Sequence, residues 1–131
     1  MGFGVGIVLQ AIAPWRLFWP AWIRHGVGWP LILVGLGLTA GAVRAAADVD
    51  MERPSQIVVS GPYAFSRNPM YVAWSLIYPG VALVVGAPWP LVLLPVVLLS
   101  THVAVGREER ALEGRFGAAY RGYKASVRRY L

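Results

Sequence analysis

Residues 68–106 read NPMYVAWSLIYPGVALVVGAPWPLVLLPVVLLSTHVAVG and contain no formally charged side chain. As one α-helix this stretch would measure about 58 Å, whereas the hydrocarbon core of a bilayer is about 30 Å thick. Gly86, Pro88 and Pro90 interrupt the stretch near its middle, because proline removes helix donors and glycine permits a turn. We therefore expect a helical hairpin of two membrane spans, at residues 69–85 and 89–105.

The rest of the chain is also more apolar than a typical soluble domain. Its 131 residues are 57% hydrophobic, include no cysteine and carry a formal charge of +6. The length predicts one domain, residues 1–131. The lack of cysteine excludes disulfide scaffolds, thiolate zinc sites and cysteine nucleophiles. Basic nucleic-acid-binding proteins are not this rich in Leu, Val and Trp, so we expect the lipid bilayer, and not nucleic acid, as the partner.

Two further stretches could cross the membrane. Residues 27–43 are uncharged and end at Arg44, and glycines 35, 37 and 41 within them suit close helix packing. Residues 3–22 are apolar but are interrupted by Pro14, Arg16 and Pro20. No basic region precedes this stretch and no small-residue cleavage pattern follows, so we do not expect a secretory signal peptide. The prediction is an all-α integral membrane protein with about four spans, or three if residues 3–22 do not cross.

The charges predict the orientation. The loop 44–68 and the tail 106–131 are separated by two spans and so share one side, and together they hold ten of the twelve Lys and Arg. By the positive-inside rule this side is cytoplasmic, as in a bacterial-type inner or plasma membrane. The aromatic residues agree: Trp15, Trp19, Trp22, Trp29 and Trp89 would gather at the outer interface, and Tyr63, Tyr71, Tyr120, Tyr123 and Tyr130 at the inner one.

A first candidate site lies directly before the hairpin, in residues 60–71, SGPYAFSRNPMY. Asn68 and Pro69 are typical of a helix start, with Asn as N-cap and Pro at the first helical position. The segment could simply be a capped helix with interfacial tyrosines. Alternatively, the free N–H groups of the helix, flanked by Arg67, Tyr63 and Tyr71, could form a polar pocket at the membrane edge.

The tail contains a second candidate site. Its apolar residues are spaced four, four, three and four apart, which predicts an amphipathic helix on an anionic membrane surface. Glu108 and Glu109 border this apolar face and need a positive partner. That partner could be a nearby arginine or a cationic ligand, and His102 would share the face of Glu109 if the last span continues into the tail. The apolar residues are Leu112, Phe116, Tyr120, Tyr123 and Val127, and the nearby arginines are Arg107, Arg110 and Arg115.

Metal binding is not expected, because two histidines and few carboxylates offer no spacing of the kind that zinc or iron sites use.

Together, the two segments resemble the isoprenylcysteine carboxyl methyltransferase and phospholipid methyltransferase family of small integral-membrane enzymes. The first family motif, Gly-Pro-Tyr followed by Arg-His-Pro-x-Tyr, is matched by residues 61–63 and 67–71, with Asn68 in place of the usual His. The second motif, a Glu pair followed by Leu, Phe-Gly, Tyr, Tyr and Val, is matched by residues 108–127. The resemblance covers residues 60–131.

The resemblance implies an enzyme that moves a methyl group from S-adenosylmethionine to a lipophilic acceptor, an isoprenoid carboxylate, a lipid amine or a thiol. It implies that Glu108 and Glu109 bind the cofactor, that Tyr63, Asn68 and Tyr71 line its pocket, and that Arg67 contacts its carboxylate. Arg107 and His102 are candidates for the acceptor side. Two alternatives remain at this stage: a steroid-reductase-like membrane reductase with a nicotinamide cofactor, and a non-catalytic protein on the same scaffold, suggested by Asn68.

Overall fold

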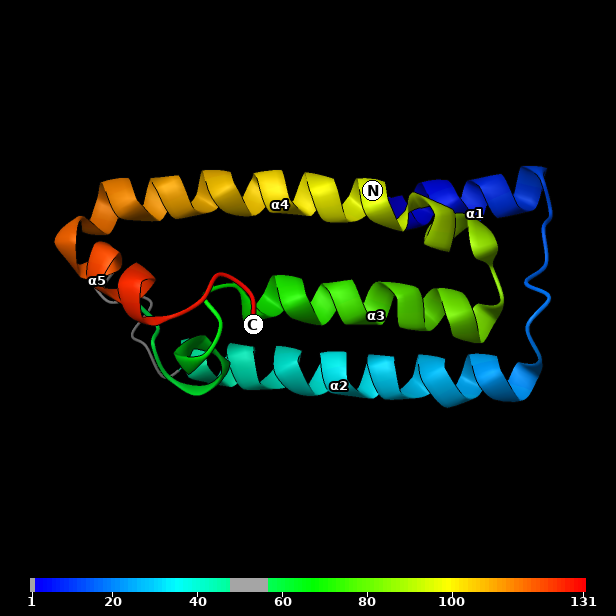
Figure 1. The fold of residues 1–131 in the computed structure, drawn as a ribbon, viewed down its shortest axis with the longest axis horizontal. Coiled ribbons are helices and arrows are strands. Elements are labelled where there is room, and N and C mark those ends of the chain that lie inside the picture. Colours follow the sequence, from blue (N-terminus) through cyan, green and yellow to red (C-terminus); the bar gives the residue numbers. More distant parts are fainter. Residues whose placement is uncertain (1, 48–56) are drawn as a thin grey trace.

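The computed structural model describes residues 2–47 and 57–131, and within them every regular element is a helix. Four helices form an elongated bundle, and a short 3-10 turn and a fifth helix lie at one end of it (Figure 1). The elements are α1 (Gly2–Ile12), α2 (Ala21–Ala47), η1 (Gly61–Ala64), α3 (Pro69–Val85), α4 (Pro88–Phe116) and α5 (Ala118–Ser126). This confirms the all-α prediction for the described residues.

The hairpin predicted from residues 68–106 is present as α3 and α4. Helix α3 ends at Val85, and Gly86 adopts the left-handed conformation with φ of +73°. The Gly86 N–H then donates to the carbonyl oxygens of Ala82 and Leu83, both at 3.0 Å. Glycine favours this conformation because it has no Cβ, and Pro88 begins α4 without needing a donor. The turn therefore forms where the sequence predicts it.

Helices α2 and α3 form the most extensive helix interface in the bundle, and small residues bring their backbones together. A Cβ on Gly35 would lie 2.8 Å from the carbonyl oxygen of Ala73, and a Cβ on Gly41 would lie 2.9 Å from Pro62 Cγ. A Cβ on Gly37 would meet nothing within 4 Å. Close helix packing is thus confirmed for Gly35, whereas Gly41 packs against the 3-10 turn η1. The interpretation is wrong for Gly37, which lies on the outward face.

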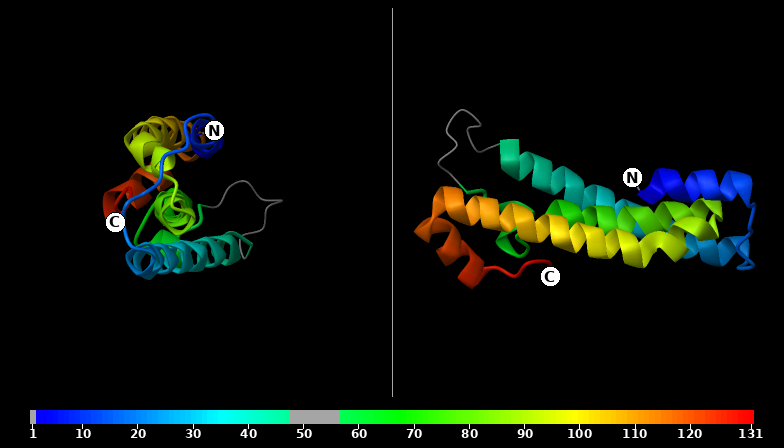
Figure 2. Two further views of the ribbon diagram at one scale, coloured as in Figure 1. Left: turned by 90° about the vertical axis from the view of Figure 1, so that its right-hand side faces the viewer. Right: turned by 90° about the horizontal axis from the view of Figure 1, so that it is seen from above.

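Helix α4 lies on the side of α3 away from α2 and packs against α3 less extensively (Figures 1 and 2). Helices α2 and α4, with 27 and 29 residues, are long and apolar enough to cross a membrane, and α3 is a shorter apolar helix. Their outward faces carry large apolar side chains, an arrangement that is stable against lipid and not against water. These side chains include Trp22, Leu33, Val34, Leu36, Val92, Val96, Leu99 and Val103.

The predicted span at residues 3–22 is wrong as a single helix. Helix α1 ends at Ile12, and residues 13–20 connect it to α2 without regular structure. Pro14 and Pro20 explain the break, since the residue before a proline disfavours the helical conformation. With eleven residues, α1 is about 16 Å long, roughly half the hydrocarbon thickness. It lies beside the first turns of α4, where the Trp89 Nε1–H donates to the carbonyl oxygen of Ala13 at 2.8 Å.

The tail also differs from its prediction as one amphipathic helix. Helix α4 continues without a break to Phe116, and the chain then turns at Gly117, whose φ is +53°. Helix α5 is therefore separate, and Val127 lies beyond its end. Tyr120 and Tyr123 of α5 are buried against the protein, at 2% and 8% exposure. The apolar residues of α5 thus pack on the fold itself.

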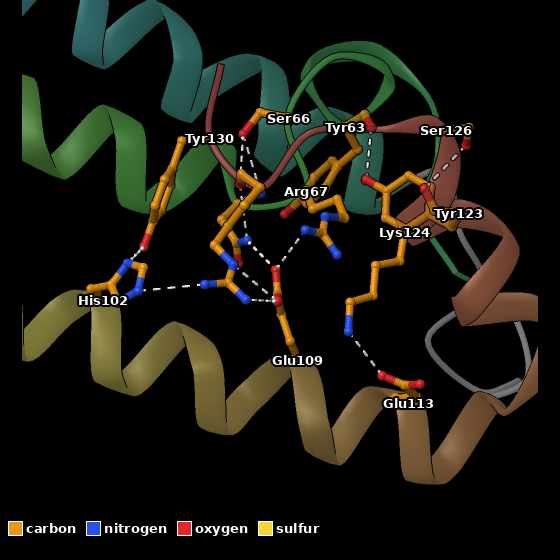
Figure 3. Close-up of polar contacts among 12 residues, drawn as sticks. Tyr63, Ser66, Arg67, His102, Glu109, Glu113, Tyr123, Lys124, Ser126 and Tyr130 are labelled. Carbon is orange, nitrogen blue, oxygen red and sulfur yellow. Dashed lines mark hydrogen bonds and ion pairs between the residues drawn. The ribbon is translucent and has the colours of Figure 1, made fainter.

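Several tryptophans and tyrosines lie at opposite ends of the bundle. Trp15 and Trp89 meet edge to face, with ring centroids 5.8 Å apart, where the α1–α2 connection passes the α3–α4 turn. Tyr63, Tyr123 and Tyr130 lie at the end where α5 is found (Figure 3). The predicted separation is thus present for these five residues, whereas Trp74 and Tyr78 lie between the two ends, on α3.

Candidate functional site

Three segments meet at the α5 end of the bundle: the loop before α3, the charged last third of α4, and residues 127–131 after α5 (Figures 1 and 3). The loop is held by α5, because the Tyr123 hydroxyl donates to the carbonyl oxygen of Tyr63 at 2.7 Å. Burial raises the pKa of Tyr123 to about 12, so this donor keeps its proton at neutral pH. The turn of α5 back over the loop therefore brings the two motif segments together.

Glu109 lies at the centre of this arrangement and is only 3% exposed. Its Oε2 accepts hydrogen bonds from Arg129 Nη2 at 2.8 Å and Arg129 Nε at 3.1 Å. Its Oε1 accepts one from Asn68 Nδ2 at 3.1 Å and lies 3.5 Å from Arg67 Nη2. A buried carboxylate requires such compensation, and here two arginines and an amide supply it.

The predicted partners Arg107, Arg110 and Arg115 do not pair with Glu109. All three are exposed, and two have other contacts: Arg110 Nε donates to the carbonyl oxygen of Gly106, and Arg115 lies over the Phe116 ring. Glu109 faces the loop before α3, whereas these three side chains lie on the outer faces of α4. Of the two alternatives that the sequence left open, the nearby arginine is therefore wrong, because the arginines that pair with Glu109 come from distant segments.

Asn68 begins α3 as predicted, but its side chain does not cap the helix. Its Nδ2 donates to Glu109 Oε1 and also to the carbonyl oxygen of Arg129, both at 3.1 Å. Its backbone N–H donates to Ser66 Oγ at 3.2 Å. The residue that replaces the usual histidine thus acts as a double hydrogen-bond donor between α4 and residues 127–131.

Glu108, next to the buried glutamate, remains exposed. The Tyr71 hydroxyl donates to its Oε2 at 2.9 Å. Burial raises the pKa of Tyr63, and the nearby negative charge of Glu108 raises it further. Glu108 therefore has two tyrosines beside it and retains acceptor capacity for an incoming cation.

Arg67 is the least satisfied cation of the site. Its side chain is 8% exposed, yet Nε and Nη1 are buried without a hydrogen-bond partner. Burial and the charge of Glu109 raise the pKa of Tyr120, while the charge of Arg67 and a side-chain hydrogen bond with it oppose both effects. The unpaired Nε and Nη1 of Arg67 favour binding of an anionic group.

His102 lies two turns before Glu109 on the same face of α4, as predicted. Its Nδ1 is 2.9 Å from the Tyr130 hydroxyl oxygen, and its Nε2 is 3.4 Å from Arg129 Nη1. Arg107, the other residue predicted for the acceptor side, is exposed on α4 and is not brought into the cluster. Arg129 and Tyr130 were not identified as site residues from sequence. Their local pattern is only that of a basic tail, and pairing with α4 depends on the turn at Gly117.

An apolar cleft of about 470 Å³ lies between α3 and α4 next to the polar cluster. It extends from Tyr71 to Val81 along α3, about 15 Å. Tyr71 belongs to both features, because its ring lines the cleft and its hydroxyl contacts Glu108. The other lining residues include Trp74, Ile77, Val81, Leu94, Val97, Leu98 and Thr101.

Within residues 2–47 and 57–131, no three His, Cys, Asp or Glu side chains are grouped so that they could hold a metal ion.

Comparisons with known proteins give one match. No curated protein and no solved structure matches the chain. A sequence model of the phospholipid methyltransferase family matches residues 23–119, well over half of the chain. The matched region includes α2, the loop with Arg67 and Asn68, α3, and α4 with its two glutamates. The chain therefore belongs to the phospholipid methyltransferase family of membrane enzymes, which use S-adenosylmethionine to methylate lipid acceptors.

Proposed function

We propose that the polar cluster at the α5 end holds S-adenosylmethionine and that the α3–α4 cleft holds the apolar chain of the lipid acceptor. Tyr71 carries this proposal, since its hydroxyl contacts Glu108 in the cluster while its ring lines the cleft. The proposed polar site for the methyl donor and the proposed apolar site for the methyl acceptor therefore both include Tyr71. Such proximity is what a transfer reaction requires of the protein, because positioning supplies much of the rate.

The residues of the cluster fit this cofactor. S-adenosylmethionine carries a sulfonium, an ammonium and a carboxylate, and it supplies an electrophilic methyl group. The unpaired Nε and Nη1 of Arg67 suit the carboxylate. Glu108 and Glu109 suit the two cationic groups, and Tyr63, Asn68 and Tyr71 complete the pocket.

The cleft supports an acceptor with a single apolar chain in one leaflet. Its length of about 15 Å is half the hydrocarbon thickness, so a chain inside it would reach the middle of the bilayer. The head group would then lie beside Tyr71 and Thr101. An isoprenoid carboxylate, a lipid amine and a thiol all suit this position.

His102, next to Thr101 on α4, is placed to accept a proton from an amine or a thiol. Arg107 is suited to an anionic part of the head group at the membrane surface.

We further propose that α2, α3 and α4 cross the membrane and that α1 enters it alongside α4 without crossing. The α5 end, with loop 44–68 and the tail, would be cytoplasmic in an inner or plasma membrane. The basic side chains support this orientation, because among the described residues Arg16, near Pro88, and Arg24, near Gly86, are the ones at the opposite end.

The cofactor site is tested by binding of S-adenosylmethionine to protein purified in detergent. We expect Glu108→Gln to raise Kd roughly tenfold or more, since a hydrogen bond to a charged group contributes about 1.5–3 kcal/mol. Glu113→Gln is the matched control, because Glu113 is on the same helix and pairs only with exposed Lys124. Equal binding by both variants would contradict the placement of the cofactor at Glu108.

The acceptor is tested by incubating the protein with a labelled methyl donor and total membrane extract, and then identifying the labelled product. We expect label in a lipid with a single apolar chain, and several-fold less of it with Glu108→Gln when the labelled donor is below the Kd of the wild type. Label confined to water-soluble products would contradict the assignment of the cleft. Cofactor binding with no methyl transfer would favour the non-catalytic alternative, and stabilisation by a nicotinamide cofactor instead would favour the reductase.

A further inference from the structure

Residues 127–131, which we call the strap, run back from α5 along the loop before α3, and the side chains of Arg129 and Tyr130 reach residues of α4 (Figure 3). The Arg67 N–H donates to the carbonyl oxygen of Arg128 at 2.9 Å. The carbonyl oxygen of Arg129 accepts from Asn68 Nδ2 at 3.1 Å and from Ser66 Oγ at 3.5 Å. At its other end, the Tyr130 hydroxyl contacts His102 Nδ1 at 2.9 Å. The strap therefore lies across the place that the proposed cofactor would use.

Arg129 occupies the position on Glu109 that a ligand cation would need. Its two N–H groups hold Oε2, and Asn68 and Arg67 lie against Oε1. Both carboxylate oxygens of Glu109 thus have protein partners, and the residue is 3% exposed. A cationic ligand can reach Glu109 only if one of these partners leaves.

Arg129 is the partner that can leave at the lowest cost. Its side chain is 34% exposed, whereas that of Arg67 is 8% exposed and Asn68 is also buried. Departure of Arg129 leaves Arg67 and Glu109 as a neutral pair, so the buried cluster does not retain an uncompensated charge. A ligand cation in its place would restore the present charge arrangement.

We propose that the strap is a displaceable gate, with Arg129 as an internal cation that competes with S-adenosylmethionine for Glu109. This inference rests on the proposed cofactor site. Binding of the cofactor would release the strap from the cluster. Arg129 would then be a specificity-determining residue, because a ligand must carry a cation to replace it.

Release of the strap would also change His102. Arginine only donates hydrogen bonds, so His102 Nε2 must be the acceptor opposite Arg129 Nη1, and Nδ1–H then donates to the Tyr130 hydroxyl. Both ring nitrogens are thus engaged by the strap. Displacement of the strap would free Nε2 of His102, one residue after the cleft-lining Thr101, so this proton acceptor would become available only after the cofactor has bound.

The first test compares the Kd of S-adenosylmethionine for the wild type, Arg129→Ala and Lys124→Ala. Lys124→Ala removes the same charge from the same region but leaves the strap contacts intact. If the closed strap is favoured about ten to one, Arg129→Ala should bind on the order of tenfold more tightly. Lys124→Ala should bind like the wild type. Equal or weaker binding by Arg129→Ala would overturn the gate and make Arg129 a structural partner of Glu109.

The second test measures the position of the strap directly. The chain has no cysteine, so Ala111→Cys and Leu131→Cys together allow two spin labels on exposed positions of α4 and the strap. We expect the distance between the labels to become longer and broader when S-adenosylmethionine is added. An unchanged distance in protein that binds the cofactor would overturn the gate.

Two further comparisons separate the possible failures. Tyr130→Phe removes the contact with His102 without a change in charge, so it should also tighten binding, by a smaller factor than Arg129→Ala. It serves as the second variant if Arg129→Ala does not fold. Absence of cofactor binding by the wild type would overturn the proposed site itself, whereas binding without an effect of either strap variant would overturn only the gate.

Discussion

The substitution Glu109→Gln should destabilise the fold far more than the same substitution at Glu113, one helical turn later on α4. Glu109 is 3% exposed and contacts two arginines and an amide. Glutamine would leave the guanidinium of Arg67, 8% exposed, without its counter-charge. The side-chain NH₂ group of glutamine would also face the N–H donors of either Arg129 or Asn68, where a carboxylate oxygen now accepts. Removal of one member of a buried ion pair costs about 3–5 kcal/mol.

Glu113 pairs with Lys124 at 3.1 Å, but these side chains are 31% and 42% exposed. An exposed ion pair contributes about 0.2–1 kcal/mol. We therefore expect a difference of about 3 kcal/mol between the two variants in the free energy of unfolding. Denaturant titration in detergent micelles, followed by circular dichroism, measures it. A difference below about 1 kcal/mol would refute the reasoning that Glu109 is the charge that holds the three segments together.

Three further predictions concern the backbone and one hydroxyl. Gly35→Ala should lower the free energy of unfolding by about 1–3 kcal/mol, because its Cβ would lie 2.8 Å from a backbone oxygen. Gly37→Ala, whose Cβ meets nothing within 4 Å, should leave the stability unchanged, and thermal unfolding compares the two variants. Gly86→Ala should cost about 1–2 kcal/mol in the same assay, since φ is +73°. The Tyr123 contribution to stability should be complete below pH 10 and be lost between pH 10 and about 12, the folded-state pKa, because only the unfolded chain releases the proton in that range. Tyrosinate absorbance should show this titration, and Tyr123→Phe should remove the share of one tyrosine from the change near pH 12.

The long apolar helices of the fold followed from the sequence because their causes are local. The hairpin depends on an uncharged stretch, a glycine and two prolines, and each acts on its own backbone or on the adjacent lipid. The span predicted at residues 3–22 failed for the same kind of reason. There Pro14 follows the end of α1 at Ile12, and Pro20 precedes the start of α2 at Ala21. The apolar composition of the stretch did not keep it helical across these prolines.

The composition of the candidate site was only partly predictable. The motif segments identified Arg67, Asn68, Tyr71, Glu108 and Glu109, and the fold brings all five to one end of the bundle. Their division of roles was not predictable, because adjacent residues on a helix point about 100° apart and only the packing of α4 decides which one is buried. The fold buries Glu109 and leaves Glu108 exposed.

The sequence by itself determined a basic-ended, helical membrane protein with three acidic residues in its tail, since charge, hydrophobic length and proline position require no knowledge of distant contacts. Only the tertiary structure decided which cation meets Glu109. Arg129 follows Glu109 by twenty residues, and Arg67 precedes it in sequence by the whole α3–α4 hairpin. Neither separation corresponds to a helical or strand repeat from which a contact could be predicted. The turn at Gly117 and the return of the strap over the loop bring them together, and such long-range pairing is a property of the folded chain alone.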